Sequence, residues 1–334
     1  MNNIIKIGVT TGDLNGIGVQ LLIQSFKDTL HKSEKFKLIL FATKSSFEFY
    51  MKLLNVNEIN YGVISNLEKS KLNQVNIYEC FSSDLSISPG KVTGESGLAA
   101  SQSLAVASKN LINNKINALV TMPVTKSNMF LGHKEPFIGH TEYLRDVTQS
   151  KETLMILLTD KLRVATATNH IPISKVSKLL TKQLLSAKLT LLVKSLRKDF
   201  QINYPKVALL GLNPHMGDSG LIGREEQEII IPLIKEFPQE NFKVSGPFSA
   251  DAFFGKSLYK NFDAVLSMYH DQGLIPFKMK SFNKGVNFTA GMNFVRTSPD
   301  HGPALDIVGS KMVNCESFIN AVFFANKIYE ARNK

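Results

Sequence analysis

The segment Ile4-Ile5-Lys6-Ile7-Gly8-Val9-Thr10-Thr11-Gly12-Asp13 decides the fold class of this 334-residue chain. Residues 4–10 are apolar and β-branched, a pattern typical of a buried strand. Gly12 then allows a sharp turn, and residues 17–27 have the apolar spacing of a helix. A strand, a glycine turn and a helix in direct succession indicate the first part of an α/β fold.

The same alternation continues along the rest of the chain. Strand-like patterns lie at residues 36–42, 118–122, 154–158, 162–168, 206–210 and 263–268, and helix-like patterns at 45–54, 97–113, 173–200, 224–237 and 316–332. Such alternation predicts a mainly parallel sheet with helices on both faces. Because a chain of this length exceeds a single typical core, we expect two lobes.

The composition is that of an ordinary globular protein, with 43% hydrophobic and 20% charged residues. No run approaches about eighteen consecutive apolar residues, so we expect no membrane span and no membrane partner. The first residues lead into a strand pattern without the apolar core of a signal peptide. Cys80 and Cys315 share no CxxC spacing. The sequence therefore predicts a cytoplasmic protein with two free thiols.

The net charge of +11 raises the alternative of a nucleic-acid-binding protein. Only six of the 39 basic residues are arginine, however, and the lysines are scattered along polar faces. No helix-turn-helix or RNP pattern accompanies them. We therefore expect no nucleic-acid partner, and we interpret the charge as attracting a phosphorylated small-molecule substrate.

Three of the seven histidines, His170, His215 and His270, each follow the end of a strand-like run. Open α/β sheets bind their ligands at the carboxyl ends of the strands. Three imidazoles at one rim could hold a divalent metal and leave coordination positions open for substrate, and the lack of nearby cysteines favours a catalytic site. The alternative for each histidine taken alone is a hydrogen-bonded loop residue.

Two glycine-containing motifs could bind an anion. Residues 12–18 form a glycine-rich turn between a strand and a helix. Leu21 stands where a dinucleotide fingerprint needs its third glycine, so a purely structural turn is the alternative. In Gly139-His140-Thr141-Glu142, the histidine and the hydroxyl could together hold a phosphate or carboxylate, and a helix cap is the alternative.

Further candidates lie in the last third of the chain. Asp251, beside apolar residues, could orient a ligand or transfer a proton, or it could cap a helix. Lys278 and Arg296, near the glycine-containing run 301–309, could clamp a phosphate or carboxylate through charge-assisted hydrogen bonds. Solvated surface cations are the alternative interpretation of both residues.

From Thr11 to Asp306, these motifs in their order closely resemble the 4-hydroxythreonine-4-phosphate dehydrogenase family of pyridoxal 5′-phosphate (vitamin B6) biosynthesis. The segments that carry the resemblance are Gly139-His140-Thr141-Glu142, Asn213-Pro214-His215, Tyr269-His270-Asp271-Gln272-Gly273 and Arg296-Thr297-Ser298-Pro299-Asp300-His301-Gly302. The resemblance implies a two-lobed α/β/α fold with mixed, largely parallel sheets, like isopropylmalate and isocitrate dehydrogenases and unlike a Rossmann fold. We expect one lobe at residues 1–135 with 297–334. The other, at 136–296, would hold most metal and substrate residues and form the dimer.

The family pattern also implies the roles of individual residues. The metal ligands would be His170, His215 and His270, holding one zinc, magnesium or cobalt ion. The substrate contacts would be His140, Thr141, Lys278, Asn287 and Arg296. Lys278 and Asp251 are both candidates for the base. The candidate NAD or NADP site is the loop with His301, Gly302, Ala304 and Asp306. The active site would be shared in a homodimer, with one metal histidine from the neighbouring subunit.

The implied reaction is NAD- or NADP-dependent oxidation of 4-phosphohydroxy-L-threonine at its C3 hydroxyl. The resulting β-keto acid would lose carbon dioxide to give 3-amino-2-oxopropyl phosphate. The positions that depart from the family pattern include Leu14, Val19, Gln20, Pro303 and Ser310. They leave threonate or erythronate 4-phosphate open as alternative substrates. A metal-dependent hydrolase using the same histidines is a less favoured alternative.

Overall fold

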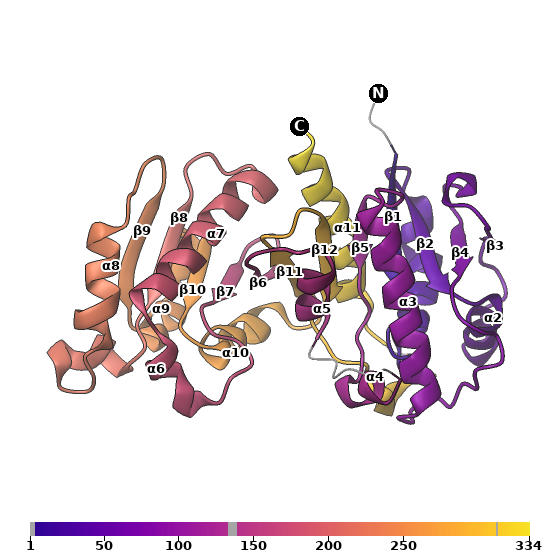
Figure 1. Cartoon of the computed structure of the whole chain (residues 1–334), viewed down its shortest axis with the longest axis horizontal. Coiled ribbons are helices and arrows are strands. Elements are labelled where there is room, and N and C mark those ends of the chain that lie inside the picture. Colours follow the sequence, from indigo (N-terminus) through magenta and orange to yellow (C-terminus); the bar gives the residue numbers. More distant parts are fainter. Residues whose placement is uncertain (1–3, 133–138, 312) are drawn as a thin grey trace. The chain divides into compact units, whose positions relative to one another are not determined.

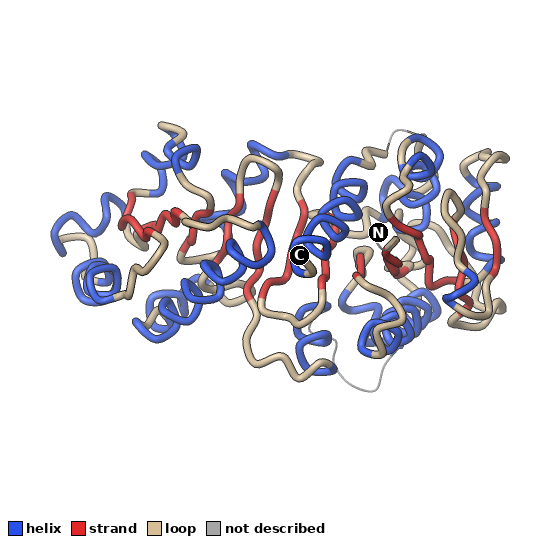
Figure 2. Tube along the Cα trace, turned by 90° about the horizontal axis from the view of Figure 1, so that it is seen from above, coloured by secondary structure: helices blue, strands red, loops and turns tan. Residues whose placement is uncertain are grey.

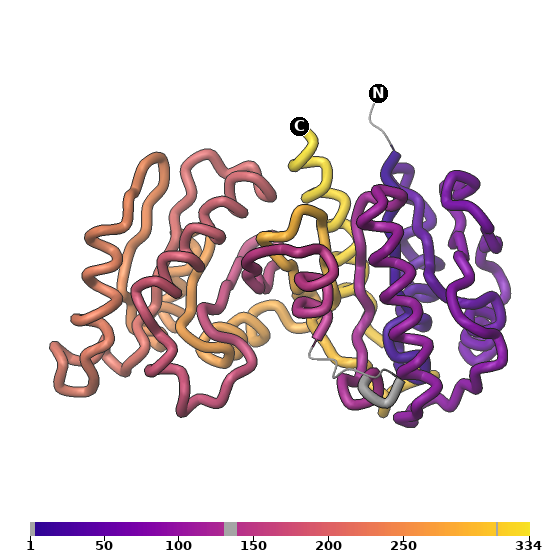
Figure 3. The backbone as a smooth tube through the Cα atoms, viewed as in Figure 1, coloured from indigo at the N-terminus to yellow at the C-terminus, as the bar shows by residue number. Residues whose placement is uncertain are grey.

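Two compact units make up the chain, and the computed structural model describes residues 4–132, 139–311 and 313–334. Unit 1 comprises residues 1–151 and 292–330, and unit 2 comprises residues 152–291 and 331–334. Figure 3 traces the chain from unit 1, in indigo and magenta, into unit 2 and then back to unit 1 in yellow. His140, Thr141 and Arg296 consequently belong to unit 1.

Unit 1 is built on parallel strands in the order β3-β4-β2-β1-β5-β12 (Figure 1). Their bounds are β1 (Ile5–Thr10), β2 (Phe36–Ala42), β3 (Tyr61–Val63), β4 (Val75–Glu79), β5 (Ala118–Val120) and β12 (Val295–Pro299). The central strands are buried on both faces and read as continuous apolar runs, as parallel strands covered by helices do.

The helices of unit 1 cover these strands. They are α1 (Gly18–Asp28), α2 (Lys44–Leu53), α3 (Gly94–Ile112), α4 (Lys126–Gly132), α5 (His140–Val147) and α11 (Glu316–Arg332), whose last residues belong to unit 2. Thr43 and Thr93 cap α2 and α3, because each hydroxyl accepts a hydrogen bond from a first-turn amide. Phe41, Leu104 and Leu119 are almost fully buried in the core between α3 and the sheet.

Unit 2 has a mixed sheet in the order β11-β6-β7-β10-β8-β9. Its strands are β6 (Leu154–Leu158), β7 (Arg163–Thr166), β8 (Lys206–Leu210), β9 (Lys243–Phe248), β10 (Ala264–Ser267) and β11 (Val286–Ala290). β6 pairs antiparallel with β7 and with β11, while β7, β10, β8 and β9 pair in parallel. The parallel strands share one carboxyl edge, and this edge positions the candidate metal histidines.

The helices of unit 2 are α6 (Val176–Leu179), α7 (Lys182–Phe200), α8 (Ile231–Glu236), α9 (Ala250–Gly255) and α10 (His270–Ser281). Figure 2 shows helices on both sides of the strands in each unit. Val164, Val265, Phe253 and Phe277 are fully buried in the core of unit 2. The predicted α/β class with mixed, largely parallel strands is therefore confirmed.

Two further expectations from the sequence can be compared with the structure. Within the described ranges, no helix is both long enough and apolar enough to cross a bilayer. Cys80 and Cys315 are free thiols, as predicted.

Candidate functional site

Three neighbouring parallel strands carry the candidate metal histidines to one edge of the unit 2 sheet. β7, β10 and β8 lie side by side in that order. His170 follows β7, His270 follows β10 and His215 follows β8. Since parallel strands end at the same edge, the three histidine loops share the rim where α/β sheets bind ligands.

His170 and His270 are brought together at this rim. Their ring centroids lie 5.8 Å apart. His270 Nδ1 lies 2.7 Å from the Asp271 carboxylate. A carboxylate that accepts from Nδ1–H leaves Nε2 to coordinate a metal, and imidazole nitrogens suit zinc or cobalt. The chemistry of this donor pair therefore fits a divalent transition metal.

His215 is not grouped with the other two histidines in the described part of the chain. Nowhere within that part do three or more His, Cys, Asp or Glu side chains gather closely enough to hold a metal ion. His215 instead lies near Asp251, whose carboxyl pKa it helps to lower. The structure thus assembles two of the three predicted ligands within one chain.

The backbone around His215 forms a left-handed turn. The φ angles of residues 215–219 are 51°, 57°, 79°, 41° and 55°. Left-handed helical geometry costs about 1–2 kcal/mol for each residue that carries a Cβ, and only Gly217 escapes that cost. Such a segment persists where its surroundings fix it, so the groups that hold this turn are part of the site.

Two side chains other than the metal histidines hold the rim loops, and sequence reasoning gave them no role. Gln272 accepts a hydrogen bond from the Met268 amide at 2.7 Å and donates to the Gly211 carbonyl at 2.6 Å. It thereby ties the ends of β10 and β8 together. Glu226, fully buried, accepts hydrogen bonds from the backbone amides of Leu212 and Asn213. Gln272 stands inside a quoted motif, but nothing in the sequence signals the burial of Glu226.

The remaining candidates of unit 2 lie on α9, α10 and β11. Asp251 is exposed. The pKa of its carboxyl is lowered by hydrogen bonds from the Ser249 hydroxyl and the Ala252 amide, and also by the nearby His215. Lys278 is exposed on α10. Asn287 is half-buried on β11, and its Oδ1 atom is buried without a hydrogen-bond partner among the described residues. A buried acceptor of this kind is available to a ligand.

A buried arginine forms the centre of the candidate site in unit 1. Arg296 on β12 is 3% exposed, and its Nε and a terminal guanidinium nitrogen donate to Thr121 Oγ1 at 2.9 and 2.6 Å. Burial lowers the pKa of Arg296 to about 10, although the Glu142 charge opposes this. Thr121, directly after β5, is a further residue that the sequence did not single out for this role.

His140 begins α5 beside this arginine. Burial, together with the charges of Arg296 and Lys126, lowers the pKa of His140 well below its ordinary value. The N-cap of α5 is Gly139, so the alternative that Thr141 caps this helix is wrong. A neutral imidazole, a guanidinium and an ammonium group that influence one another create a positive environment suited to a phosphate or carboxylate.

The candidate cofactor loop, residues 301–306, is held by the first helix of unit 1. The Ile17 amide donates to the Pro303 carbonyl at 3.0 Å. Gln20, which is fully buried, accepts from the Gly309 amide at 2.9 Å and donates to the Ser310 carbonyl at 2.7 Å. The loop is therefore held at Pro303, between Gly302 and Ala304, and again after Asp306, at Gly309 and Ser310.

The glycine-rich turn at residues 12–18 is itself fixed by buried groups. Gly12 has a φ of 68°, and a Cβ at this position would lie 2.5 Å from the Pro123 carbonyl. The buried Asp13 carboxylate accepts from the Asn15 amide and from the side chain of Asn128. These contacts support the structural interpretation of this turn.

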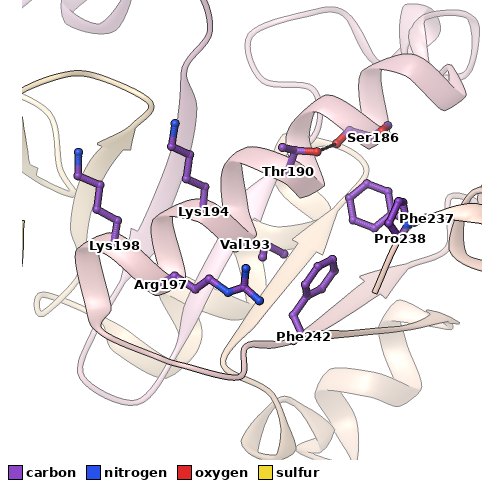
Figure 4. Close-up of a pocket in the computed structure, with 9 residues that line it drawn as sticks. All are labelled: Ser186, Thr190, Val193, Lys194, Arg197, Lys198, Phe237, Pro238 and Phe242. Carbon is purple, nitrogen blue, oxygen red and sulfur yellow. Dashed lines mark hydrogen bonds between the residues drawn. The ribbon is translucent and has the colours of Figure 1, made fainter. Parts of the chain in front are cut away.

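A pocket of about 700 Å³ lies elsewhere in unit 2, between α7 and residues 237–242. The described residues that line it include none of the candidates above. Figure 4 shows Lys194 and Lys198 pointing away from Phe242, while the Arg197 guanidinium lies 5.5 Å from the Phe242 ring centroid. Because the two lysines point away from Phe242 while Arg197 lies against its ring, the three cations do not converge on one point, and this pocket does not resemble an anion site.

Comparisons with known proteins agree with these motifs. The family described as "Pyridoxal phosphate biosynthetic protein PdxA" matches residues 34–325. A 4-hydroxythreonine-4-phosphate dehydrogenase of Bacteroides thetaiotaomicron is 37% identical over 333 residues, which cover 99% of this chain and 91% of that protein. One from Aquifex aeolicus is 38% identical over 319 residues, covering 95% and 96%.

The fold is shared with solved structures of the same enzyme. The crystal structure of 4-hydroxythreonine-4-phosphate dehydrogenase from Klebsiella pneumoniae superposes with a TM-score of 0.84 at 29% identity, covering 97% of this chain and 99% of that one. These matches over nearly the full length show that the chain belongs to the pyridoxal phosphate biosynthetic protein PdxA family and is an oxidoreductase.

Proposed function

We propose that this protein is a cytoplasmic enzyme that oxidises 4-phosphohydroxy-L-threonine at its C3 hydroxyl with NAD or NADP, in pyridoxal 5′-phosphate biosynthesis. The β-keto acid product then loses carbon dioxide to give 3-amino-2-oxopropyl phosphate. The observation that carries the proposal is the match over 99% of the chain to a relative named 4-hydroxythreonine-4-phosphate dehydrogenase. The histidine rim and the buried arginine support it.

The substrate's charged groups are bound by side chains of unit 1. Arg296 offers a guanidinium already oriented by Thr121, and such planar donors suit phosphate and carboxylate oxygens. His140 and Thr141 add donors at the start of α5. In unit 2, the unpaired Oδ1 of Asn287 can accept a hydrogen bond from a substrate hydroxyl or ammonium group.

The metal is held by His170 and His270 of one subunit with His215 of its neighbour. This arrangement is supported by the short distance between the first two rings and by the separate position of His215. When bound, a divalent cation lowers the pKa of the substrate hydroxyl and stabilises negative charge on its oxygen. The site thus requires a homodimer.

The exposed apolar face of α10 supports the homodimer. Ile275, Met279 and Phe282 are 57%, 79% and 76% exposed. A large apolar patch beside a ligand site is typical of a protein interface. Since α10 begins at His270, covering this face with a second copy brings another chain close to the metal histidines.

Lys278 is the favoured proton acceptor. Asp251 is the other candidate, but the hydrogen bonds from the Ser249 hydroxyl and the Ala252 amide lower the pKa of its carboxyl and make it a weaker base. Lys278 lies on α10, two turns after His270. The nicotinamide cofactor is received by the loop with His301, Gly302, Ala304 and Asp306.

The test is NADH or NADPH formation by the zinc-loaded protein with three substrates: 4-phosphohydroxy-L-threonine, threonate 4-phosphate and erythronate 4-phosphate. We expect the highest kcat/KM for the first, together with release of carbon dioxide. A higher kcat/KM for either of the others would change the substrate assignment. Release of inorganic phosphate without reduction of the cofactor would support a hydrolase instead.

A further inference from the structure

We infer that Glu226 is a positioning residue that fixes the His215 turn for metal binding. The inference rests on the proposed metal role of His215. In the described part of the chain, the hydrogen bonds of Glu226 go to Leu212 and Asn213 and to none of the metal histidines or candidate substrate groups, so it would act through the backbone that carries His215.

The Glu226 carboxylate binds the segment directly before His215. Its Oε1 accepts from the backbone amides of Leu212 and Asn213 at 2.7 and 2.8 Å. Its Oε2 accepts from the side-chain amide of Asn213 at 2.9 Å. Three donors thus converge on one fully buried carboxylate, and charge-assisted hydrogen bonds of this kind are strong and short.

The carboxylate is packed closely against two glycines, one on each side of His215 in the sequence. A Cβ on Gly211 would lie 3.0 Å from Glu226 Oε1, and one on Gly217 would lie 2.8 Å from Oε2. Gly217 belongs to the left-handed turn, with a φ of 79°. Glu226 therefore contacts the segment both before and after His215, and it holds a backbone conformation that this sequence would otherwise avoid.

A negatively charged acceptor is required here because all three groups facing it are donors. A glutamine at this position would present its own NH₂ group to an N–H donor of Asn213 or to a backbone amide. The neighbouring Glu225 provides a matched comparison. It is half-buried and also accepts from the Asn213 side chain, at 2.7 Å, but it bonds to no backbone amide of residues 212 or 213 in the hydrogen bonds of the described chain.

The experiment compares zinc affinity in the full-length apoprotein, measured by competition with a chromophoric chelator. Loss of a group that orients a metal ligand costs about 10–100-fold in affinity, and we expect Glu226→Gln to show a loss in this range. Glu225→Gln should stay within about threefold of the unchanged protein, since it keeps an acceptor for Asn213. The KM for NAD is the control for folding, because a general loss of folded structure would raise it. We expect it to stay unchanged in both variants.

Two further variants separate the possible outcomes. His215→Ala sets the affinity without the ligand itself, and Asn213→Ala removes only one of the three hydrogen bonds to Glu226. Should E226Q fail to fold, a weakened zinc affinity in N213A supports the inference and an unchanged one overturns it. If H215A loses zinc while folded E226Q binds it normally, the role of Glu226 is wrong and the metal site stands. If H215A itself binds zinc normally, the proposed metal site is wrong.

Discussion

At the scale of single residues, His140 links the candidate anion site to the stability of unit 1. Burial and the charges of Arg296 and Lys126 lower its pKa well below 6.5, which is the ordinary value in an unfolded chain. Below about pH 6.5 the unfolded chain therefore binds a proton at His140 that the folded unit does not bind. The contribution of neutral His140 to the free energy of unfolding is complete above that pH and decreases as the pH falls.

We predict that His140→Gln makes unfolding less dependent on pH in this range. The measurement is the midpoint of urea unfolding between pH 7 and pH 5, for the variant and for the unchanged protein. The midpoint should fall less steeply in the variant, since one proton-linked term is removed. His31→Gln is the control and should keep the steeper slope. Equal slopes for H140Q and the unchanged protein would contradict the described environment of His140.

A second prediction concerns the buried arginine. Arg296→Lys keeps a positive charge but replaces a planar fork by a single ammonium, which cannot make both bonds to Thr121. We expect weaker binding of 4-phosphohydroxy-L-threonine by about tenfold or more, with an unchanged Kd for NAD. Isothermal titration calorimetry measures both constants. An unchanged substrate Kd would remove Arg296 from the substrate site.

The candidate residues show what the sequence could and could not predict. His140 and Arg296 could be chosen as candidates because they stand in a motif and near a glycine loop, and the structure brings them together. Thr121 and Glu226 were missed because their importance depends on burial and on partners 175 and 13 residues away. A single sequence carries no signal for such contacts.

At the scale of secondary-structure elements, several strands were predicted with correct bounds, among them residues 36–42, 154–158 and 206–210. β3, β4, β9, β11 and β12 were not predicted. β9 is a partly exposed edge strand with a glycine and a proline. β11 and β12 carry Asn287 and Arg296, polar residues that interrupt the apolar pattern on which strand prediction depends.

Several of the positions that were expected to depart from the family pattern lie on two segments of unit 1 that contact each other. Gln20 on α1 is hydrogen-bonded to Gly309 and Ser310, and the Ile17 amide donates to the Pro303 carbonyl. Four departures, Val19, Gln20, Pro303 and Ser310, thus lie on the two segments that form this contact. Both atoms of the Gln20 amide group are used, one as acceptor and one as donor, so the contact is specific for glutamine.

We therefore predict that Gln20→Glu loosens the candidate cofactor loop. A buried carboxylate cannot donate to the Ser310 carbonyl, and the loss should destabilise unit 1 by about 2–3 kcal/mol. The KM for NAD should rise while the KM for the phosphorylated substrate stays the same. Gln24→Glu, at a half-buried position on the same helix, is the control. Equal effects of Q20E on both KM values would argue for a general loss of structure and against a role in the loop.

At the scale of the whole molecule, the proposed homodimer depends on the exposed face of α10. Met279 is 79% exposed on this face, between Ile275 and Phe282. Burying an apolar side chain of this size contributes about 1.5–3 kcal/mol, and a buried unpaired carboxylate would cost more. We predict that Met279→Asp shifts the protein to a monomer in analytical ultracentrifugation and abolishes turnover. A variant that remains dimeric would place the interface elsewhere.

A shared site makes a sharper prediction, because two inactive variants should restore each other. His215→Ala lacks the ligand that a subunit would give to its neighbour, while His170→Ala lacks one that it would use itself. In a mixed dimer, one of the two sites then receives His170 and His270 from the first chain and His215 from the second. Random mixing of equal amounts should recover about a quarter of the native activity, since half of the dimers are mixed and each has one complete site.

Mixing H170A with His270→Ala is the control and should recover none, because both ligands come from the same chain. If H215A and H170A also fail to restore activity when mixed dimers have formed, all three histidines act within one subunit, and the separation of His215 from the other two must close by movement of its own loop.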